Sequence, residues 1–463
     1  MDYDLIVIGS GPGGYVAAIR AAQLKMKVAV VEKAETGGIC LNWGCIPTKS
    51  LLKSAQVLDY LNHSADYGIK VDGTVRPDFA SIIARSRSVA ENMSKGIQFL
   101  FRKNSIELIK GYGRLAGNNT VEVEDNQGSR KNIQAKNIII ATGARARELP
   151  GLKIDGVRII GYREAMTLKE QPRTMVIVGS GAIGSEFAGF YQTLGTKVTL
   201  VEFLPRLVPN EDEEVSKQLE RSFKKLGMKI MTGSEVESVD LSGDTCKVNI
   251  KTRDGMTVAE ADVVLSAAGV TANIEDIGLE KAGVETEKGK IRVDEFYRTS
   301  SAGIYAIGDV VKGPALAHVA SAEGIVCVEK IAGLNPEPLD YNNIPACTYT
   351  NPEIASCGLT EEAARKAGYE IKVGKFPFTA SGKASASGTK EGFVKLVFDA
   401  AYGELLGAHM IGANVTEMIG EIVVARKLET TAHEIMKSVH PHPTMSEAIM
   451  EAAAAAYGEV INL

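Results

Sequence analysis

The feature that most constrains the fold of this chain is a pattern that occurs twice. A short apolar run at residues 5–8 leads directly into a glycine-rich turn, and a similar run at 175–178 leads into a second one. The glycines of the two turns, each spaced G-x-G-x-x-G, are Gly9, Gly11 and Gly14, and Gly179, Gly181 and Gly184. A helix-like stretch follows each turn, and then another short apolar run, at 28–31 and at 198–201. Strands that alternate with helices in this way predict βαβ units and a parallel sheet.

The repeat extends beyond the glycines, which strengthens the prediction of two related domains. Residues 261–269 parallel 136–143, and residues 150–173 between the copies have the character of a linker. From about residue 341 the pattern changes to alternating strands followed by helices, which is typical of an α+β segment. A chain of 463 residues is long enough for about three domains. We therefore expect an α/β protein with two Rossmann-like dinucleotide-binding domains and a C-terminal α+β domain.

Each glycine-rich turn stands where a dinucleotide is bound in such folds. Glycines allow a tight turn and close approach to a pyrophosphate, and the following helix presents N–H groups and the positive end of its dipole. Glu32 and Glu202 end the second strand of their repeats, where a carboxylate accepts hydrogen bonds from ribose hydroxyls. A carboxylate also repels a 2′-phosphate, so Glu202 favours NAD over NADP. If either motif is taken alone, the alternative to nucleotide binding is a glycine turn that binds no ligand.

Cys40 and Cys45 stand close together, whereas the other four of the six cysteines are scattered and are expected to be buried thiols. A zinc site would need two further Cys or His ligands nearby, and none follows, so we expect no metal. A close pair in a reducing compartment is therefore expected to be redox-active. A dithiol cannot pass hydride directly to nicotinamide, whereas a flavin can mediate the transfer. We expect the first repeat, which precedes the cysteines, to bind FAD and the second to bind NAD.

The residues that follow the cysteines indicate which sulfur faces the flavin. Pro47 is suited to the first position of a helix, which would place Cys45 near the helix N-terminus, where the thiolate is favoured. Lys49 would lie on the first turn of that helix. Spacing alone leaves open whether Lys49 lies by the flavin or is a solvated lysine.

A site that handles thiols also needs a base, and the segment HPHPTMSE offers one. Two prolines fix the chain around His442, while a structural role is favoured for His440. Thr444 and Glu447 have the spacing of a capping box, which would make Glu447 only a helix cap. Alternatively, Glu447 orients His442 and stabilises its imidazolium. Spacing alone leaves both roles of Glu447 open.

Charge and hydropathy exclude other classes of partner. The formal net charge of −5 argues against nucleic acid or an anionic membrane as the main partner. No run of about 18 apolar residues predicts a membrane span. The N-terminus is acidic and has neither a basic n-region nor an Arg/Ser-rich transit character. We expect a bacterial-type cytoplasmic protein, with a processed protein of the mitochondrial matrix as the alternative.

Taken together, these motifs resemble those of the flavin-dependent pyridine nucleotide–disulfide oxidoreductases over the whole length of the chain. GGICLNWGCIPTKSLL is similar to the redox-active signature of that family, and HPHPTMSE to its C-terminal catalytic signature. Within the family the resemblance is closest to enzymes that oxidise dihydrolipoamide with NAD. It implies that Cys40 is the interchange thiol, Cys45 the charge-transfer thiol beside the flavin, His442 the base and Glu447 its partner.

The resemblance also implies binding residues and domains. The implied FAD contacts are Gly9, Gly11, Gly14, Glu32, Lys49, Gly113, Asp309 and Ala317. The implied NAD contacts are Gly179, Gly181, Gly184, Glu202, Val236 and Gly269. The implied domains are 1–149 (FAD-binding, with the redox disulfide), 150–271 (NAD-binding), 272–340 (completing the FAD site) and 341–463 (dimerisation).

A homodimer follows from the same resemblance, with the histidine of one subunit serving the disulfide of the other. The implied partners are the lipoyl domains and acyltransferase core of a 2-oxoacid dehydrogenase complex, or the lipoyl carrier protein of glycine cleavage. Two alternatives stay open: another NAD(P)H-dependent flavoprotein disulfide reductase, and a flavin-binding redox sensor or scaffold.

Overall fold

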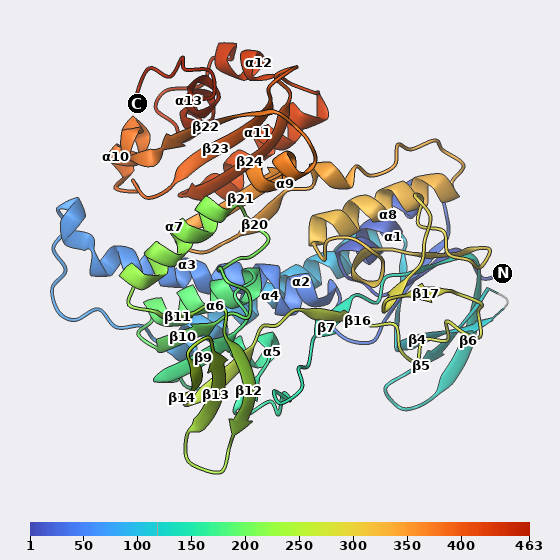
Figure 1. Cartoon of the computed structure of the whole chain (residues 1–463). Helices are drawn as coiled ribbons and strands as arrows, with labels where there is room; N and C mark the ends of the chain where they lie inside the picture. Colours follow the sequence, from blue (N-terminus) through green and yellow to red (C-terminus); the bar gives the residue numbers. More distant parts are fainter. Residues whose placement is uncertain (118) are drawn as a thin grey trace. The chain divides into compact units, whose positions relative to one another are not determined.

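The computed structural model describes residues 1–117 and 119–463, and the chain divides into two compact units (Figure 1). The first unit consists of Met1–Leu51, Asp78–Arg147 and Gly269–Leu339. The second consists of Leu52–Pro77, Glu148–Ala268 and Asp340–Leu463. Neither unit is one continuous range of sequence, because the chain passes between them several times.

A seven-stranded sheet forms the centre of the first unit. Its strands in spatial order are β3 (Glu107–Lys110), β2 (Val28–Glu32), β1 (Tyr3–Ile8), β6 (Arg130–Ile140), β5 (Thr120–Glu124) and β4 (Tyr112–Gly117), with β19 (Ile304–Ala306) also paired to β6. β3, β2, β1, β6 and β19 run parallel, and β5 and β4 continue from β6 as an antiparallel meander. The apolar residues 5–8 are almost fully buried, as expected for a strand inside a parallel sheet that is covered on both faces.

Helices and two small strand pairs complete this part of the chain. The helices are α1 (Pro12–Gln23), α2 (Gly38–Trp43), α3 (Cys45–Asn62), α4 (Phe79–Lys103) and α8 (Ala317–Ile331), with α3 continuing into the second unit. The strand pairs are β7 (Ala144–Ala146) with β16 (Val270–Ala272), and β17 (Thr286–Glu287) with β18 (Lys290–Ile291). α1 and α8 pack closely, because a Cβ on Gly324 would lie only 2.8 Å from the carbonyl oxygen of Gly13.

A five-stranded parallel sheet in the second unit repeats the plan of the first. Its order is β11 (Lys229–Met231), β10 (Lys197–Val201), β9 (Thr174–Val178), β15 (Val263–Ser266) and β8 (Ile159–Ile160). Helix α6 (Ala182–Thr193) follows β9, and α7 (Glu213–Lys225) follows β10. An antiparallel meander of β12 (Glu235–Asp240), β13 (Cys246–Thr252) and β14 (Gly255–Ala261) precedes β15, as β4 and β5 precede β6 in the first unit.

The interpretation of residues 150–173 as a linker was wrong. This segment supplies the edge strand β8 and the short helix α5 (Tyr162–Ala165), and β8 pairs with β15. A strand of two residues is too short to produce a periodic signal, so the pattern could not reveal it.

The C-terminal part of the second unit is an antiparallel sheet with helices against it. The strand order is β20 (Ala346–Thr348), β21 (Glu353–Gly358), β24 (Leu405–Gly412), β23 (Phe393–Asp399) and β22 (Ile371–Pro377). The helices are α9 (Glu361–Lys366), α10 (Gly382–Ser387), α11 (Val415–Lys427), α12 (Ala432–Lys437) and α13 (Glu447–Ala455). β23 and β24 are buried along their whole length, because α11 and α13 pack against the sheet.

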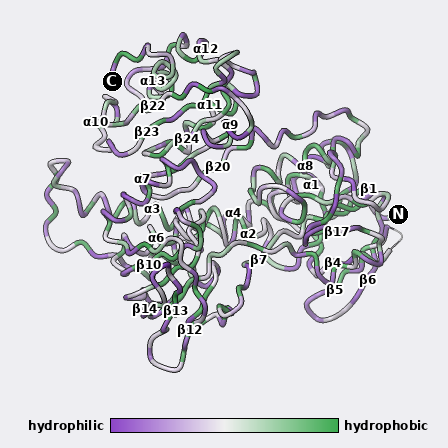
Figure 2. The backbone as a smooth tube through the Cα atoms, viewed as in Figure 1, coloured by the Kyte–Doolittle hydropathy of each residue, from purple (hydrophilic) through white to green (hydrophobic). Residues whose placement is uncertain are grey.

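This arrangement confirms the predicted fold class of two Rossmann-like α/β folds followed by an α+β domain. Figure 2 shows hydrophobic segments within the sheets and hydrophilic residues in many of the loops that connect them. In residues 1–117 and 119–463, no helix has the length and apolar character needed to cross a membrane.

Candidate active site

The first glycine-rich turn joins β1 to α1, and two of its glycines are required by steric contacts. Gly9 has a φ of +102°, and a Cβ there would lie 2.2 Å from the carbonyl oxygen of Ala141. A Cβ on Gly14 would lie 2.0 Å from the carbonyl oxygen of Gly9. A Cβ on Gly11, by contrast, would meet nothing within 4 Å. The backbone at Gly11 is therefore open to a ligand at the N-terminus of α1.

The second turn, between β9 and α6, repeats this geometry. Gly179 has a φ of +101°, and a Cβ on Gly184 would lie 1.8 Å from the carbonyl oxygen of Gly179. Gly181 again has open space where its Cβ would be. Both copies thus present a bare helix N-terminus suited to a phosphate group.

A serine in each turn is held by the acidic residue at the end of the second strand. Glu32 Oε2 accepts hydrogen bonds from Ser10 N–H (2.9 Å) and Ser10 Oγ (2.6 Å). Glu202 Oε2 accepts the equivalent bonds from Ser180 N–H (2.8 Å) and Ser180 Oγ (2.7 Å). Both carboxylates are almost fully buried beside their turns.

Sequence reasoning missed the two serines. The signal was present, because both turns read G-S-G, but a serine at the variable position of the motif carries no requirement of its own. Each serine couples the turn to the segment beyond the acidic residue, since Ser10 Oγ also accepts from Gly37 N–H (3.1 Å) and Ser180 Oγ from Val208 N–H (3.2 Å).

The two candidate redox cysteines lie on consecutive helices. Cys40 lies in α2 and is partly buried, while Cys45 is the first residue of α3 and is exposed; both are free thiols. Hydrogen bonding to the Cys45 side chain, reinforced by burial, raises the pKa of the Cys40 thiol far above its usual value, although Lys49 acts in the opposite direction. Cys45 is the first residue of α3, and the N-terminus of a helix is a place where a thiolate is stabilised.

The position expected for Pro47 needs a correction. α3 begins at Cys45, so Pro47 is its third residue and not its first. The helix begins two residues earlier than the proline suggests, which brings the sulfur of Cys45 into the first turn, where N–H groups are unsatisfied.

The C-terminal pair His442 and Glu447 is in hydrogen-bond contact. His442 Nδ1 lies 2.8 Å from Glu447 Oε1, and Thr444 N–H donates to Glu447 Oε2 at 2.8 Å. Partial burial acts to raise the pKa of Glu447, but the bonds from Thr444 and His442 lower it below its usual value. Because the ionised carboxylate can only accept, Nδ1 carries a proton and Nε2 is left as the basic atom of the ring.

Glu447 also begins α13, but only half of the expected capping box is present, namely the bond from Thr444 N–H to the Glu447 side chain. Thr444 Oγ1 donates to the carbonyl oxygen of Pro441 (2.7 Å) and does not cap the helix. His440 has a different environment, since its Nε2 lies 2.8 Å from Glu421 and its side chain is 7% exposed, against 76% for His442. Of these two histidines, only His442 therefore presents its ring to solvent. The cysteine pair belongs to the first unit, and the His442–Glu447 pair belongs to the second.

The other four residues expected to contact FAD lie in the first unit, and one of them, Lys49, is the fifth residue of α3. Asp309 is in the turn Gly308–Val310, where burial raises its pKa while Lys290 acts in the opposite direction. Ala317 is the first residue of α8. Gly113 lies in β4, where a Cβ would come within 3.1 Å of the side chains of Ile8 and Val31.

The remaining residues expected to contact NAD are Val236 and Gly269. Val236 is a partly buried residue of β12 that packs on the core beneath β9 and β15. Gly269 has a φ of +103° and open space where a Cβ would be.

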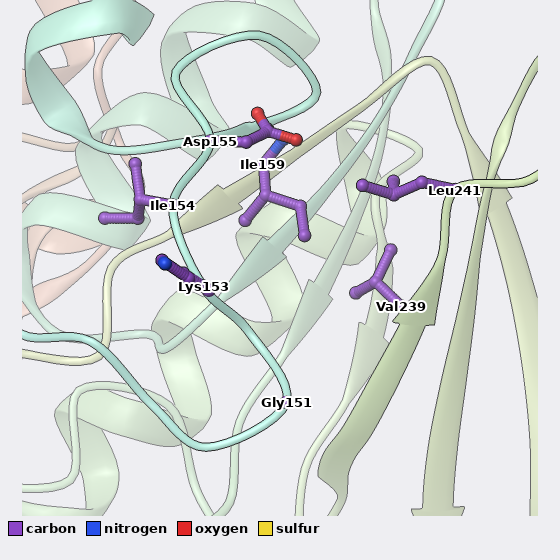
Figure 3. Close-up of a pocket in the computed structure, with 7 residues that line it drawn as sticks. All are labelled: Gly151, Lys153, Ile154, Asp155, Ile159, Val239 and Leu241. Atoms are coloured by element: carbon purple, nitrogen blue, oxygen red, sulfur yellow. The ribbon is translucent and has the colours of Figure 1, made fainter.

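A pocket in the second unit holds none of the predicted site residues (Figure 3). It is lined by Gly151, Lys153, Ile154, Asp155, Ile159, Val239 and Leu241. Its carboxylate, Asp155, already accepts hydrogen bonds from the N–H groups of Val157, Arg158 and Ile159. These bonds stabilise the loop that contains Asp155. In the part of the chain that the structure describes, no group of His, Cys, Asp or Glu is arranged to hold a metal ion.

Two family models match the chain in tandem. The first, described as pyridine nucleotide-disulphide oxidoreductase, matches residues 3–324. The chain belongs to this family. The second, the dimerisation domain of the pyridine nucleotide-disulphide oxidoreductases, matches residues 344–453.

Curated members of the family align with this chain over nearly its whole length. Dihydrolipoyl dehydrogenase of Zymomonas mobilis is 50% identical, with 99% of each chain covered. Dihydrolipoyl dehydrogenase of Rhizobium etli is 49% identical, again with 99% of each covered. The enzyme of the same name from Bacillus subtilis is 45% identical over all of this chain and 99% of its own.

Two solved structures share the fold of this chain. The crystal structure of LpdA from Mycobacterium tuberculosis superposes with a TM-score of 0.91 at 28% identity, covering 97% of this chain and 98% of that one. The flavoprotein disulfide reductase RclA of Escherichia coli, solved as a Cu(II) complex, gives 0.87 at 25% identity, covering 98% of this chain and 99% of that one.

Proposed function

We propose that this protein is an FAD-dependent enzyme that oxidises dihydrolipoyl groups and passes the electron pair to NAD. The observation that carries this proposal is the 45–50% identity, over almost the whole chain, to enzymes named dihydrolipoyl dehydrogenase. Two side-chain pairs support it: two cysteines on consecutive helices whose side chains are hydrogen-bonded, and a histidine oriented by a carboxylate.

The two glycine-rich turns fit the binding of two dinucleotides. Open space at Gly11 and Gly181 would admit a pyrophosphate, and Glu32 and Glu202 lie beside the turns to meet ribose hydroxyls. We assign FAD to Gly9, Gly11, Gly14, Glu32, Lys49, Gly113, Asp309 and Ala317. We assign NAD to Gly179, Gly181, Gly184, Glu202, Val236 and Gly269. Bound FAD supplies the transfer of an electron pair from sulfur to nicotinamide as hydride.

The reaction at sulfur follows from the properties of four side chains. His442 Nε2 takes the proton of a substrate thiol, and Glu447 stabilises the resulting imidazolium. The substrate thiolate attacks Cys40 of a Cys40–Cys45 disulfide, so that the bond between the two cysteines breaks and Cys45 leaves as a thiolate. The second substrate thiol then attacks the substrate sulfur bound to Cys40; the bond between that sulfur and Cys40 breaks, and the proton of the second thiol passes to Cys40, which leaves as a thiol. This step closes the lipoyl disulfide and leaves two electrons on the reduced cysteine pair.

The match to a dimerisation domain supports a homodimer. We propose that His442 of one subunit serves the cysteine pair of the other. We further propose, as partners, the lipoyl domains and acyltransferase core of a 2-oxoacid dehydrogenase complex or the lipoyl carrier of glycine cleavage, in the bacterial cytoplasm. The proposed domains are 1–149 and 272–340 for FAD, 150–271 for NAD and 341–463 for dimerisation. Pairing of β19 with β6 supports the joining of 272–340 to the first of these.

A steady-state assay with dihydrolipoamide and NAD tests the proposal. The purified protein is expected to be yellow and to form NADH on mixing with both substrates. Protein that stays colourless after reconstitution with FAD would contradict the assignment. The similarity to RclA favours a second candidate, reduction of another disulfide, which predicts faster turnover with glutathione disulfide or a related compound than with lipoamide.

A further inference from the structure

The second unit contains a buried cluster of charges that the mechanism above does not use. Lys395 lies in β23, and its side chain is 3% exposed. Its Nζ lies 3.1 Å from both carboxylate oxygens of Asp212, and 2.9 Å from Glu214 Oε1 and Glu361 Oε2. Burial alone would lower the pKa of Lys395, but bonds to Glu361 and Glu214 and the charge of Asp212 raise it above its usual value. Lys395 is therefore a permanent cation.

Asp212 connects this cation to the nucleotide-binding repeat. Its side chain is as buried as that of Lys395, and Oδ1 also accepts from Glu214 N–H at 3.0 Å as the N-cap of α7. Residues 203–212, here called the ribose loop, link Glu202 at the end of β10 to α7. In Figure 1, α7 lies against the C-terminal sheet, in agreement with its contact with β24. Lys395 thus fixes the far end of the ribose loop to the dimerisation domain.

Hydrogen bonds continue from Asp212 along the ribose loop to the second glycine-rich turn. Glu211 N–H donates to the carbonyl oxygen of Val208 at 2.9 Å. Val208, which has a φ of +38°, donates its own N–H to Ser180 O (3.3 Å) and Ser180 Oγ (3.2 Å). Ser180 Oγ in turn donates to Glu202. One hydrogen-bonded turn, Val208 to Glu211, and the bonds of Val208 to Ser180 therefore connect the anchor at Asp212 with the carboxylate proposed to bind the ribose.

The first repeat has a lysine in a comparable role. Lys110 Nζ donates to Ala34 O (2.8 Å) and Thr36 Oγ1 (3.4 Å), in the segment directly after Glu32. Lys110 is exposed, however, and lies in the same sheet as Glu32. In the second repeat the anchoring lysine comes instead from the C-terminal sheet and is buried. A buried ion pair adds little net stability compared with apolar side chains, and in some proteins it serves instead to fix geometry.

We propose that Lys395 is a positioning residue for the pyridine nucleotide, and that it acts through Asp212 to hold the ribose loop closed on the second glycine-rich turn. The inference rests on the proposed assignment of NAD to this repeat. It does not depend on the identity of the thiol substrate.

Asp212→Asn is the test, because asparagine caps a helix as well as aspartate but removes the charge that meets Lys395. The affinity of the holoenzyme for NAD is measured by calorimetric titration. We expect the dissociation constant to rise about tenfold, as when one charge-assisted hydrogen bond to a binding loop is lost. The KM for NAD should rise in parallel with little change in kcat at saturating NAD. Anaerobic reduction of the bound flavin by dihydrolipoamide, which needs no NAD, should keep its wild-type rate.

Glu361→Gln is the matched control, because it removes one carboxylate from the same ammonium but lies on α9, outside the ribose loop. We expect its NAD dissociation constant to stay within about twofold of the wild-type value, because in the described part of the chain Glu361 contributes no hydrogen bond or ion pair to the ribose loop. Equal weakening of NAD binding in both variants, or none in Asp212→Asn, would overturn the proposal.

If Asp212→Asn yields no holoenzyme, Asp212→Ser, which caps α7 with a hydroxyl, is titrated with NAD instead and judged by the same rise in dissociation constant.

Two further results, both with the wild-type protein, keep this test separate from that of the proposed function. Wild-type protein that binds NAD but does not oxidise dihydrolipoamide would overturn the thiol substrate and leave the role of Lys395 intact. Wild-type protein that binds no NAD would overturn both.

Discussion

Glu211→Gln should make the free energy of unfolding depend less on pH, because Glu211 is a buried carboxyl group with too few hydrogen-bond partners. Its exposed fraction is 7%, Ser356 hydrogen-bonds to it, and in residues 1–117 and 119–463 its Oε2 has no hydrogen-bond partner. Burial raises the pKa of Glu211 to about 7, with the Ser356 bond acting against the rise and the charge of Asp212 adding to it. The folded protein therefore binds this proton more tightly than the unfolded chain does.

The sign and size of the effect follow from that shift. Glu211 has a pKa of 4.5 in the unfolded chain and about 7 in the folded protein. Its proton therefore adds its full contribution to the free energy of unfolding below pH 4.5, and this contribution is lost as the pH rises to about 7. A shift of this size is equivalent to about 3 kcal/mol in total, of which about 2.5 kcal/mol falls between pH 5 and pH 8. Glutamine does not titrate, so the variant should lack this loss.

Urea unfolding between pH 5 and pH 8, at fixed protein and FAD concentrations, measures the difference. The wild-type protein should lose about 2.5 kcal/mol more than Glu211→Gln over this range. An unsatisfied amide in the variant lowers its stability equally at every pH, and therefore leaves the comparison of slopes intact. Glu362→Gln is the control, because Glu362 is exposed and its loss should not change the wild-type slope. Parallel curves for the wild type and Glu211→Gln would refute the reasoning.

Three further predictions concern the proposed chemistry. His442→Gln should reduce turnover of dihydrolipoamide by about 10²–10⁴-fold, because the thiol loses its base, while electron transfer from NADH to an artificial acceptor is retained; equal loss of both activities would contradict the role of His442. Cys45→Ser should abolish the thiolate-to-flavin absorption band of the reduced enzyme, and a band that persists would assign the charge to the other sulfur. Gly14→Ala should give protein that loses its flavin absorbance on gel filtration, because the added Cβ would lie 2.0 Å from the Gly9 carbonyl oxygen; tightly bound flavin in this variant would show that the turn can relax.

The sequence predicted the parts of the molecule whose constraints are local. Gly14 must be glycine because of an atom five positions before it in the chain, so the spacing G-x-G-x-x-G alone carries the requirement. His442 and Glu447 likewise meet within one short segment, and their contact was one of the two roles that the spacing left open for Glu447. Spacing did not decide between the two roles of Glu447, and the structure shows it at the start of α13 and bonded to His442.

Contacts between distant parts of the sequence left no comparable pattern. Lys395 and Asp212 are separated by 183 residues, and each reads as an ordinary surface charge in its own segment. β8 is two residues long and is stabilised only by pairing with β15, which lies far along the chain. A charge becomes a buried anchor, and a dipeptide becomes a strand, only through partners that the local pattern does not contain.

The duplicated βαβ unit places the same local structure in two different surroundings. In both copies a serine and a glutamate fix the turn with the same bonds, so the two proposed dinucleotide sites differ little up to the end of the second strand. The two copies diverge beyond that strand. After Glu32 the chain reaches α2 and the cysteines within a few residues, and Gly37 N–H bonds back to Ser10. After Glu202 it forms a longer loop whose end is fixed by Lys395. The short connection places sulfur beside the first turn, and the longer one makes the second turn dependent on the dimerisation domain.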